Sequence, residues 1–180
     1  MLLSLVGLPG SGKTTVGRQL ARRLGLRFVD SDQAIESRLG CSIREFFERE
    51  GEPRFRDIEA EVIETLMQDC DCVVSTGGGA VLREENRRHL RQRGRVIYLK
   101  STPEELFRRL RHDTNRPLLQ VSDPMSRLRE LFEYRDPLYS EVAHFILETG
   151  RPSVASLVNM IVMQLELDGH NETSPYREKA

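Results

Sequence analysis

A glycine-rich stretch near the start of the chain has the residue types and the spacing of a phosphate-binding loop. Residues 7–14 read Gly-Leu-Pro-Gly-Ser-Gly-Lys-Thr, which fits G-x-x-x-x-G-K-[ST]. Glycines let consecutive backbone N–H groups turn toward a phosphate, and a helix N-terminus adds positive potential. We expect Lys13 to reach the β- and γ-phosphates and the Thr14 hydroxyl to ligate Mg²⁺ directly. The expected nucleotide contacts of this loop are Gly10, Ser11, Gly12, Lys13, Thr14 and Thr15.

Two carboxylates follow the second predicted strand, where both could face the phosphate loop. Asp30 and Asp32 are separated by one residue, and ligands of an open parallel sheet bind at the carboxyl ends of its strands. Asp30 could hold a magnesium-bound water there, while Asp32 could accept or orient a substrate hydroxyl. Alternatively, both merely cap the helix that begins near Gln33, a common use of Asp at that position. Spacing alone leaves the two interpretations open.

Other sequence features narrow the class of phosphate-loop protein. Guanine-specific GTPases normally carry Asn-Lys-x-Asp after a later strand, and this chain has none. Gly10 and Gly12 are followed by Thr15, so G-x-G-x-x-G is incomplete and a dinucleotide site is disfavoured. The predicted strand Cys72–Ser75 leads into Thr76-Gly77-Gly78-Gly79 without an acidic residue. The carboxylate of an ordinary Walker B site must therefore come from elsewhere.

The elements that position these residues alternate between short apolar runs and longer amphipathic stretches. The runs predict strands at Leu2–Val6, Leu26–Val29, Cys72–Ser75, Val96–Leu99 and Phe145–Leu147. Thr102, Pro103 and Glu105 form the sequence of a helix start with a capping box. Asp123-Pro124 repeats the cap-and-proline signal, and a last helix is expected over roughly 153–167. Strands dominated by Val, Ile and Leu are covered on both faces, which predicts an α/β layered domain around a parallel sheet of about five strands.

The composition excludes several broad classes. The 180 residues carry 27 basic and 28 acidic side chains, and a net charge of −1 argues against a nucleic-acid partner held by bulk positive charge. No apolar run approaches the ~18 residues of a membrane span, and the first residues lack the charged leader of a signal peptide. The three cysteines fit neither a redox motif nor a zinc site. We expect one domain over residues 1–167, a flexible tail over 168–180, no membrane partner and a cytoplasmic location.

An ordered set of motifs resembles the shikimate kinase family. The set comprises Gly7-x4-Gly12-Lys13-Thr14, Phe28-x-Asp30-x-Asp32, Phe55-Arg56-x-x-Glu59, Thr76-Gly77-Gly78-Gly79, Arg116-Pro117-Leu118-Leu119 and Arg135-x-Pro137-Leu138-Tyr139. Each later motif is weak alone, but six in order from residue 2 to about 167 are specific. The resemblance implies the three-layer P-loop fold of nucleoside monophosphate kinases, a substrate-binding segment at about 31–62, a mobile lid at about 111–123, and a monomer.

The same resemblance implies roles for particular residues. Asp32 would contact the shikimate hydroxyls, either as general base or by orienting the reacting hydroxyl, and Arg56 and Arg135 would clamp the substrate carboxylate. The backbone of Gly77, Gly78 and Gly79 would contact the ring hydroxyls. Arg116 would reach the transferring phosphoryl group, Asp30 would hold Mg²⁺ through water beside Thr14, and Arg109 and Arg151 would contact ATP. Arginine suits the clamp because its donor fork binds both oxygens of a carboxylate.

The activity implied is transfer of the γ-phosphoryl of ATP to the 3-hydroxyl of shikimate, with Mg²⁺ as cofactor, in aromatic amino acid biosynthesis. Two alternatives remain at this stage. A related kinase would act on another carboxylated polyol such as gluconate. A non-catalytic ATP-binding regulatory module would use the phosphate loop for affinity alone, although a switch has no need of Asp32, Arg56 and Arg135 to clamp a small acid.

Overall fold

The five predicted strands form one parallel sheet. A computed structural model of the chain describes residues 1–69, 71–112 and 121–172. The strands are β1 (Leu2–Val6), β2 (Arg27–Asp30), β3 (Cys72–Ser75), β4 (Arg95–Lys100) and β5 (Phe145–Glu148), in the order β2-β3-β1-β4-β5. Every strand pair is parallel. All five lie within one or two residues of the predicted ranges, because their apolar runs are short and clearly bounded.

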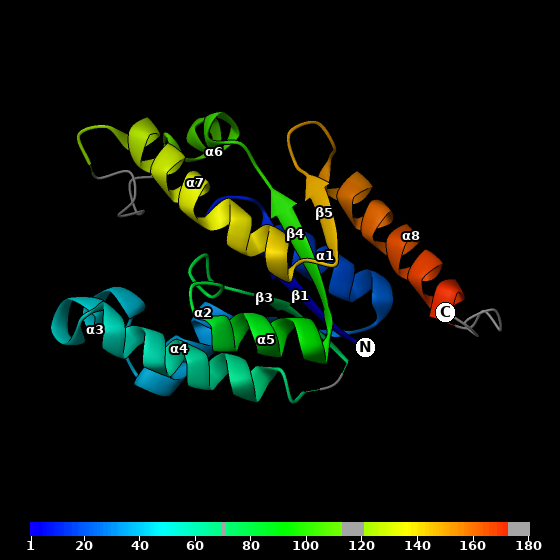
Figure 1. Cartoon of the computed structure of the whole chain (residues 1–180), viewed down its shortest axis with the longest axis horizontal. Helices are drawn as coiled ribbons and strands as arrows, with labels where there is room; N and C mark the ends of the chain where they lie inside the picture. Colours follow the sequence, from blue (N-terminus) through cyan, green and yellow to red (C-terminus); the bar gives the residue numbers. More distant parts are fainter. Residues whose placement is uncertain (70, 113–120, 173–180) are drawn as a thin grey trace, which may run out of the picture.

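Within the described ranges, eight helices connect and flank the strands (Figure 1). They are α1 (Lys13–Leu24), α2 (Ser31–Leu39), α3 (Ile43–Glu50), α4 (Glu52–Leu66), α5 (Glu84–Arg93), α6 (Pro103–Leu110), α7 (Pro124–Val142) and α8 (Val154–Glu172). Thr102 and Glu105 form the predicted capping box of α6. The Asp123 side chain accepts a hydrogen bond from the backbone of Ser126 and caps α7, as its sequence also predicts.

Alternate residues of the strands feed two separate cores, one on each face of the sheet. On one face, Leu3 and Leu5 pack with α1 and α8. On the other, Val6, Val74 and Tyr98 pack with α5, α6 and α7. Burial on both faces explains why the strands read as continuous apolar runs. The observed architecture is thus the predicted three-layer α/β fold.

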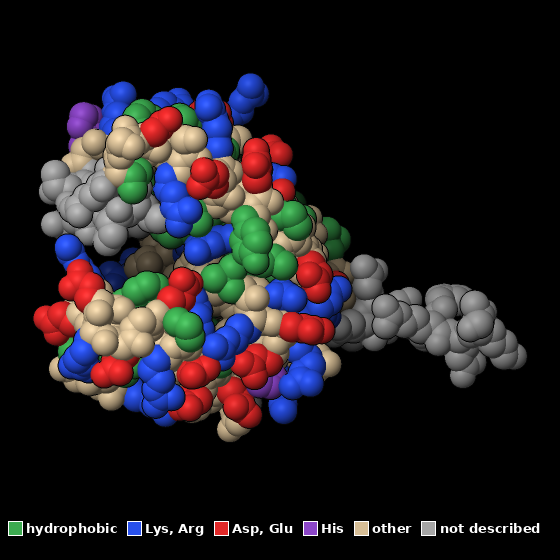
Figure 2. All heavy atoms as spheres, turned by 60° about the vertical axis from the view of Figure 1, so that its left-hand side comes forward, with side chains coloured by type: hydrophobic (Ala, Val, Ile, Leu, Met, Phe, Trp, Pro, Cys, Tyr) green, Lys and Arg blue, Asp and Glu red, His purple; other side chains and the backbone are tan. Residues whose placement is uncertain are grey.

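A third, smaller core lies among α2, α3 and α4, away from the main sheet. Its buried members are Ile35, Phe46, Phe55, Ile58 and Val62. These helices fill the lower left of Figure 1, while α6 and the start of α7 lie above them. The face shown in Figure 2 is hollowed between these two parts of the molecule. Residues on α2 and α4 are thereby held opposite residues on α6 and α7.

The end of the last helix differs from the prediction. The expected helix ends near Leu167, but α8 continues to Glu172, so the first five residues of the expected tail are helical. Asp168 pairs with Arg95 at 2.8 Å, a contact between residues too distant in sequence for periodicity to show. None of the described helices has the length and apolar character needed to cross a membrane.

Candidate active site

The phosphate loop connects β1 directly to α1, as its motif predicts. Gly12 precedes the helix with φ 96°, a left-handed conformation that glycine adopts without steric cost. A Cβ atom on Gly7 would lie 2.6 Å from the carbonyl oxygen of Leu99, so only glycine fits where the loop leaves the strand. The buried Lys13 ammonium donates hydrogen bonds to the carbonyls of Gly7 (2.7 Å) and Leu8 (3.0 Å). Its charge is therefore held inside the curve of the loop.

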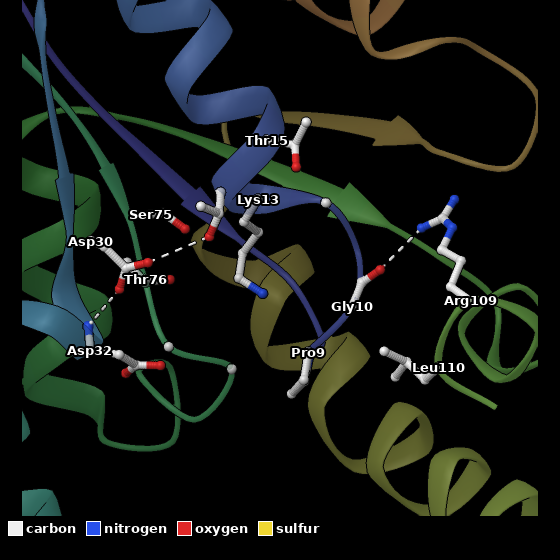
Figure 3. Close-up of a pocket in the computed structure, with 14 residues that line it drawn as sticks. Pro9, Gly10, Lys13, Thr15, Asp30, Asp32, Ser75, Thr76, Arg109 and Leu110 are labelled. Atoms are coloured by element: carbon white, nitrogen blue, oxygen red, sulfur yellow. Dashed lines mark hydrogen bonds between the residues drawn. The ribbon is translucent and has the colours of Figure 1, made fainter. Parts of the chain in front are cut away.

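A cavity of about 450 Å³ opens beside this loop. Its lining residues come from the loop and from the carboxyl ends of β2 and β3, with one side closed by α6: Pro9, Gly10, Gly12, Lys13, Thr14, Thr15, Asp30, Asp32, Ser75, Thr76, Gly77, Gly78, Arg109 and Leu110. Figure 3 shows Asp30 and Asp32 on one side of Lys13, and Gly10 and Arg109 on the other. The cavity thus has an acidic wall and a basic wall with the phosphate loop between them.

The two carboxylates of the acidic wall, Asp30 and Asp32, make different contacts. Asp30 is the N-cap of α2, because its Oδ1 accepts hydrogen bonds from the backbone of Asp32 (2.9 Å) and Gln33 (3.3 Å). Its other oxygen lies 3.4 Å from the hydroxyl of Thr14. Capping and proximity to the phosphate loop, which the sequence offered as alternatives, therefore coexist in Asp30. Asp32 lies in the first turn of α2, and its side chain points into the cavity (Figure 3).

Burial makes Asp32 an unusually weak acid for its type. Loss of solvent raises its pKa above the ordinary value of 3.8, and the neighbouring charge of Asp30 raises it further. Lys13 and Arg56 act in the opposite direction. A carboxylate with a raised pKa is a better proton acceptor than a solvated one, which suits a group that faces a substrate hydroxyl.

Arg56 lies on α4 and is held by two glutamates. It pairs with Glu59 at 2.7 Å and with Glu52 at 3.4 Å. Glu59 is 2% exposed, and burial raises its pKa while Arg56 lowers it. These i, i+3 and i, i+4 pairs are also the usual ones of an arginine on a helix surface. The Arg56 side chain, however, is only 14% exposed, and it faces the glycine run that follows β3.

Each glycine of the run Gly77–Gly79 lies against a different neighbour. A Cβ atom on Gly77 would lie 2.5 Å from Oδ1 of Asp32. One on Gly78 would lie 2.7 Å from Pro9 Cδ and 3.4 Å from Arg135 Nη1, and one on Gly79 would lie 2.6 Å from Cζ of Arg56. The absence of side chains therefore allows Asp32, Arg135 and Arg56 to gather around one short loop.

The loop itself is fixed by hydrogen bonds from three directions. The backbone N–H of Gly77 donates to the hydroxyl of the buried Ser31 (3.0 Å). Thr76 donates through its hydroxyl to the carbonyl of Leu5 (2.8 Å), and Tyr139 donates to the carbonyl of Gly78 (2.5 Å). Arg135, one turn before Tyr139 on α7, contributes to the electrostatic environment of both Tyr139 and Glu59. Arg56 and Arg135 therefore lie against neighbouring glycines, Arg56 at Gly79 and Arg135 at Gly78.

Arg109 links the phosphate loop to the end of β5. Its guanidinium donates to the carbonyl of Gly10 (3.3 Å), the hydroxyl of Ser101 (3.2 Å) and the carbonyl of Thr149 (3.1 Å). Arg151, which follows the same turn, lines a separate cavity of about 390 Å³ with Pro152 and Met160. The structure therefore places Arg109 at the phosphate loop and Arg151 in a different cavity. Arg116 and most of the expected lid lie outside the described residues.

Three residues with a structural part in the site received no role from the sequence. Glu59 and Tyr139 belong to quoted motifs, at i+3 from Arg56 and i+4 from Arg135, a spacing that places each pair on one helix face. That spacing was the available signal. Ser31, between the two aspartates, has no comparable signal, because its contact with Gly77 joins segments 46 residues apart.

A phosphate loop at the carboxyl edge of this sheet, with acidic and basic groups facing it, places the molecule among the P-loop kinases. The sequence matches the shikimate kinase family over residues 9–166. A shikimate kinase of Paracidovorax citrulli is 58% identical over 176 residues, covering 96% of both chains. The chain belongs to the shikimate kinase family.

Solved structures agree with the sequence comparison. The structure of shikimate kinase from Acinetobacter baumannii in complex with shikimate has a TM-score of 0.88 and 45% sequence identity, covering 93% of both chains. A gluconokinase from Sinorhizobium meliloti has a TM-score of 0.65 at 18% identity, covering 96% of this chain and 97% of its own. The second likeness is one of fold alone.

Proposed function

We propose that this protein transfers the γ-phosphoryl group of ATP to the 3-hydroxyl of shikimate, giving shikimate 3-phosphate and ADP for aromatic amino acid biosynthesis. The observation that carries the proposal is the gathering of Asp32, Arg56 and Arg135 around Gly77–Gly79, beside the phosphate loop. A phosphate site and a carboxylate-binding pair on adjoining walls fit a small hydroxy acid as phosphoryl acceptor. Family membership supports the same activity.

Arg56 and Arg135 bind the acceptor's carboxylate in this proposal. Each guanidinium offers a planar donor fork, and Arg56 is already oriented by Glu59 and Glu52. A substrate without a carboxylate would leave partly buried guanidinium groups without an acceptor, which opposes its binding. The backbone of Gly77, Gly78 and Gly79 binds the ring hydroxyls, because no side chain separates that backbone from a small polyol.

The nucleotide binds on the other side of the cavity. Backbone N–H groups from Gly10 to Thr15 surround the phosphates at the start of α1, and Lys13 binds the β- and γ-phosphates. Arg109, which contacts Thr149, and Arg151, which lines the separate cavity, border the nucleoside. Arg116 remains assigned to the transferring phosphoryl group, on its place in the sequence motif alone.

The chemical step needs positioning and charge stabilisation more than covalent assistance. The 3-hydroxyl oxygen forms a bond to the γ-phosphorus while the bond from that phosphorus to the bridging oxygen of ADP breaks. Asp32 accepts the hydroxyl proton, and its raised pKa favours that transfer. Lys13 and Arg116 stabilise charge on the phosphoryl oxygens as the bond to ADP lengthens.

Mg²⁺ fits the residues that the phosphate loop offers. Thr14 and Asp30 place a hydroxyl and a carboxylate oxygen 3.4 Å apart, and oxygen donors are the ligands that Mg²⁺ prefers. Thr14 would bind the ion directly and Asp30 through water, since Asp30 already caps α2. When bound, the ion neutralises phosphate charge.

The balance of charges supports small-molecule substrates without a nucleic-acid partner. We further propose that the protein is monomeric and cytoplasmic and has no membrane partner.

ADP release in the presence of ATP and Mg²⁺ tests the function, with shikimate, gluconate or no acceptor. Shikimate should stimulate release strongly and gluconate should not. Release that is independent of any acceptor would support an ATPase or a regulatory module, and stimulation by gluconate alone would support the other kinase.

A further inference from the structure

Two buried tyrosines lie next to the Gly77–Gly79 loop, one against the loop and one against the first tyrosine. The proposed reaction uses neither of them. Tyr98 on β4 and Tyr139 on α7 are at most 1% exposed. Their ring centroids are 5.0 Å apart, with the rings tilted by 37°. Their hydroxyl groups have different partners, because Tyr98 donates to Asp136 (2.7 Å) and Tyr139 donates to the carbonyl of Gly78 (2.5 Å).

Arg135 lies one turn before Tyr139 on α7 and approaches the same glycine, because a Cβ atom on Gly78 would lie 3.4 Å from Nη1 of Arg135. The hydrogen bond from the Tyr139 phenol therefore fixes the Gly78 backbone at the point where the guanidinium of Arg135 approaches it. Burial raises the pKa of Tyr139 to about 12 against the opposing effect of Arg135. The phenol therefore keeps its proton, and remains a donor to Gly78, at every pH near neutrality.

We propose that Tyr139 is a positioning residue that sets the position of Arg135 relative to the Gly78 backbone. Because Arg135 is assigned to the acceptor's carboxylate and Gly78 to its hydroxyls, their separation must match one small hydroxy acid. Tyr139 thereby controls affinity for the acceptor while leaving the nucleotide side unaffected. This inference rests on the proposed function, and it adds a specificity role for a residue that does not itself touch substrate.

The surrounding helix explains why a side-chain link is needed at this point. Pro137 lies inside α7 between Arg135 and Tyr139, and its missing N–H removes one backbone hydrogen bond from this turn. Tyr98 and Lys100 fasten the same turn to β4 through Asp136. Tyr139 fastens it to the glycine loop. The two tyrosines are thus alike in burial and in their mutual ring contact, but their hydroxyl groups have different hydrogen-bond partners.

This difference provides a matched pair of variants. Tyr139→Phe should raise the KM for shikimate about ten-fold, the effect of losing the buried hydrogen bond that fixes Gly78 beside Arg135, and leave the KM for ATP unchanged. Tyr98→Phe removes a hydroxyl from the same stacked pair and should leave both KM values unchanged. Urea unfolding of both variants measures the structural contribution of each hydroxyl separately.

A double variant tests whether Tyr139 acts through Arg135. Once Arg135→Lys is present, adding Tyr139→Phe should raise the KM for shikimate by much less than ten-fold. An unchanged KM for shikimate in the single Tyr139→Phe variant would overturn the inference. So would an equal rise in both KM values, or the same rise from Tyr98→Phe. Shikimate-dependent turnover by the unaltered protein, measured in parallel, tests the proposed function separately.

A measurement on the unaltered chain covers the case in which Tyr139→Phe does not fold. Tyrosine labelled with ¹³C at Cζ gives one NMR signal for each of the four tyrosines. The Tyr139 signal is assigned by elimination from Tyr98→Phe, Tyr134→Phe and Tyr176→Phe. Shikimate should shift the Tyr139 signal and leave that of Tyr98 in place. A Tyr139 signal that does not respond to saturating shikimate would contradict the inference.

Discussion

Arg56 occupies the space that a side chain at position 79 would fill. A Cβ atom on Gly79 would lie 2.6 Å from Cζ of Arg56, closer than non-bonded atoms approach. Because Arg56 is also paired with the buried Glu59, it has little freedom to move aside. The absence of a side chain at Gly79 therefore leaves room for the guanidinium group of Arg56, and it also exposes the backbone of Gly79.

Gly79→Ala should displace Arg56 and raise the KM for shikimate at least ten-fold, while the KM for ATP stays within a factor of about two. Steady-state kinetics with each substrate varied in turn measures both values. Gly169→Ala on α8 is the control, since a Cβ atom there would meet nothing within 4 Å. The control should keep normal kinetics and gain about 0.5–1 kcal/mol of stability from its better helix propensity. Normal shikimate kinetics in Gly79→Ala would remove Arg56 from the carboxylate clamp.

The two glutamates that hold Arg56 should differ strongly in importance. Glu59→Gln replaces a buried partner and should lower the free energy of unfolding by about 1–3 kcal/mol, with a raised KM for shikimate. Glu52→Gln removes an exposed partner and should cost less than about 1 kcal/mol. Urea denaturation and shikimate kinetics of both variants make the comparison. Equal effects from the two substitutions would show that burial of Glu59 does not matter to the site.

The raised pKa of Asp32 predicts that ionisation of this carboxyl lowers the free energy of unfolding of the protein. Because the native carboxyl holds its proton more tightly than the unfolded one, the unfolding free energy attributable to Asp32 falls as pH rises from 3.8 through the raised pKa. Asp32→Asn should therefore be more stable than the unaltered protein above that range. Its kcat should fall at least a hundred-fold, with ADP affinity retained. Urea unfolding across pH and single-turnover kinetics measure the two effects, and parallel stability profiles would contradict the pKa argument.

Arg109→Lys should weaken ATP binding specifically. A lysine cannot reach Gly10, Ser101 and Thr149 together, whereas the arginine does. We expect the KM for ATP to rise about ten-fold and that for shikimate to remain unchanged. The exposed neighbour Arg108 provides the control, and Arg108→Lys should leave both values unchanged. A rise in the KM for shikimate would place Arg109 on the acceptor side instead.

The sequence was sufficient to predict the fold and the position of the phosphate loop. The strands are short apolar runs ended by polar residues. Lys13 and Thr14 follow the first strand at the spacing of a phosphate-binding loop. The start of α6 was equally clear, because Thr102, Pro103 and Glu105 act locally. Features whose causes lie within a few residues were therefore predictable.

Features that depend on distant contacts were not. The spacing of Asp30 and Asp32 fits a helix cap and a ligand equally well, and only the fold shows that Asp30 does both jobs while Asp32 faces the cavity. Arg56 has the i+3 pairing of an ordinary surface arginine, and its burial against Gly79 depends on a loop 23 residues away. The pairing of Asp168 with Arg95 likewise lies beyond any local pattern.

The position of the new phosphate ester tests the central claim most directly. The protein is incubated with ATP, Mg²⁺ and shikimate, and the product is analysed by ³¹P–¹H correlation NMR. We predict a single new phosphomonoester whose phosphorus couples to the proton on C3 of shikimate, with ADP formed in equal amount. Absence of an ester, or coupling to a different ring proton, would contradict the placement of the acceptor between Arg56, Arg135 and Asp32.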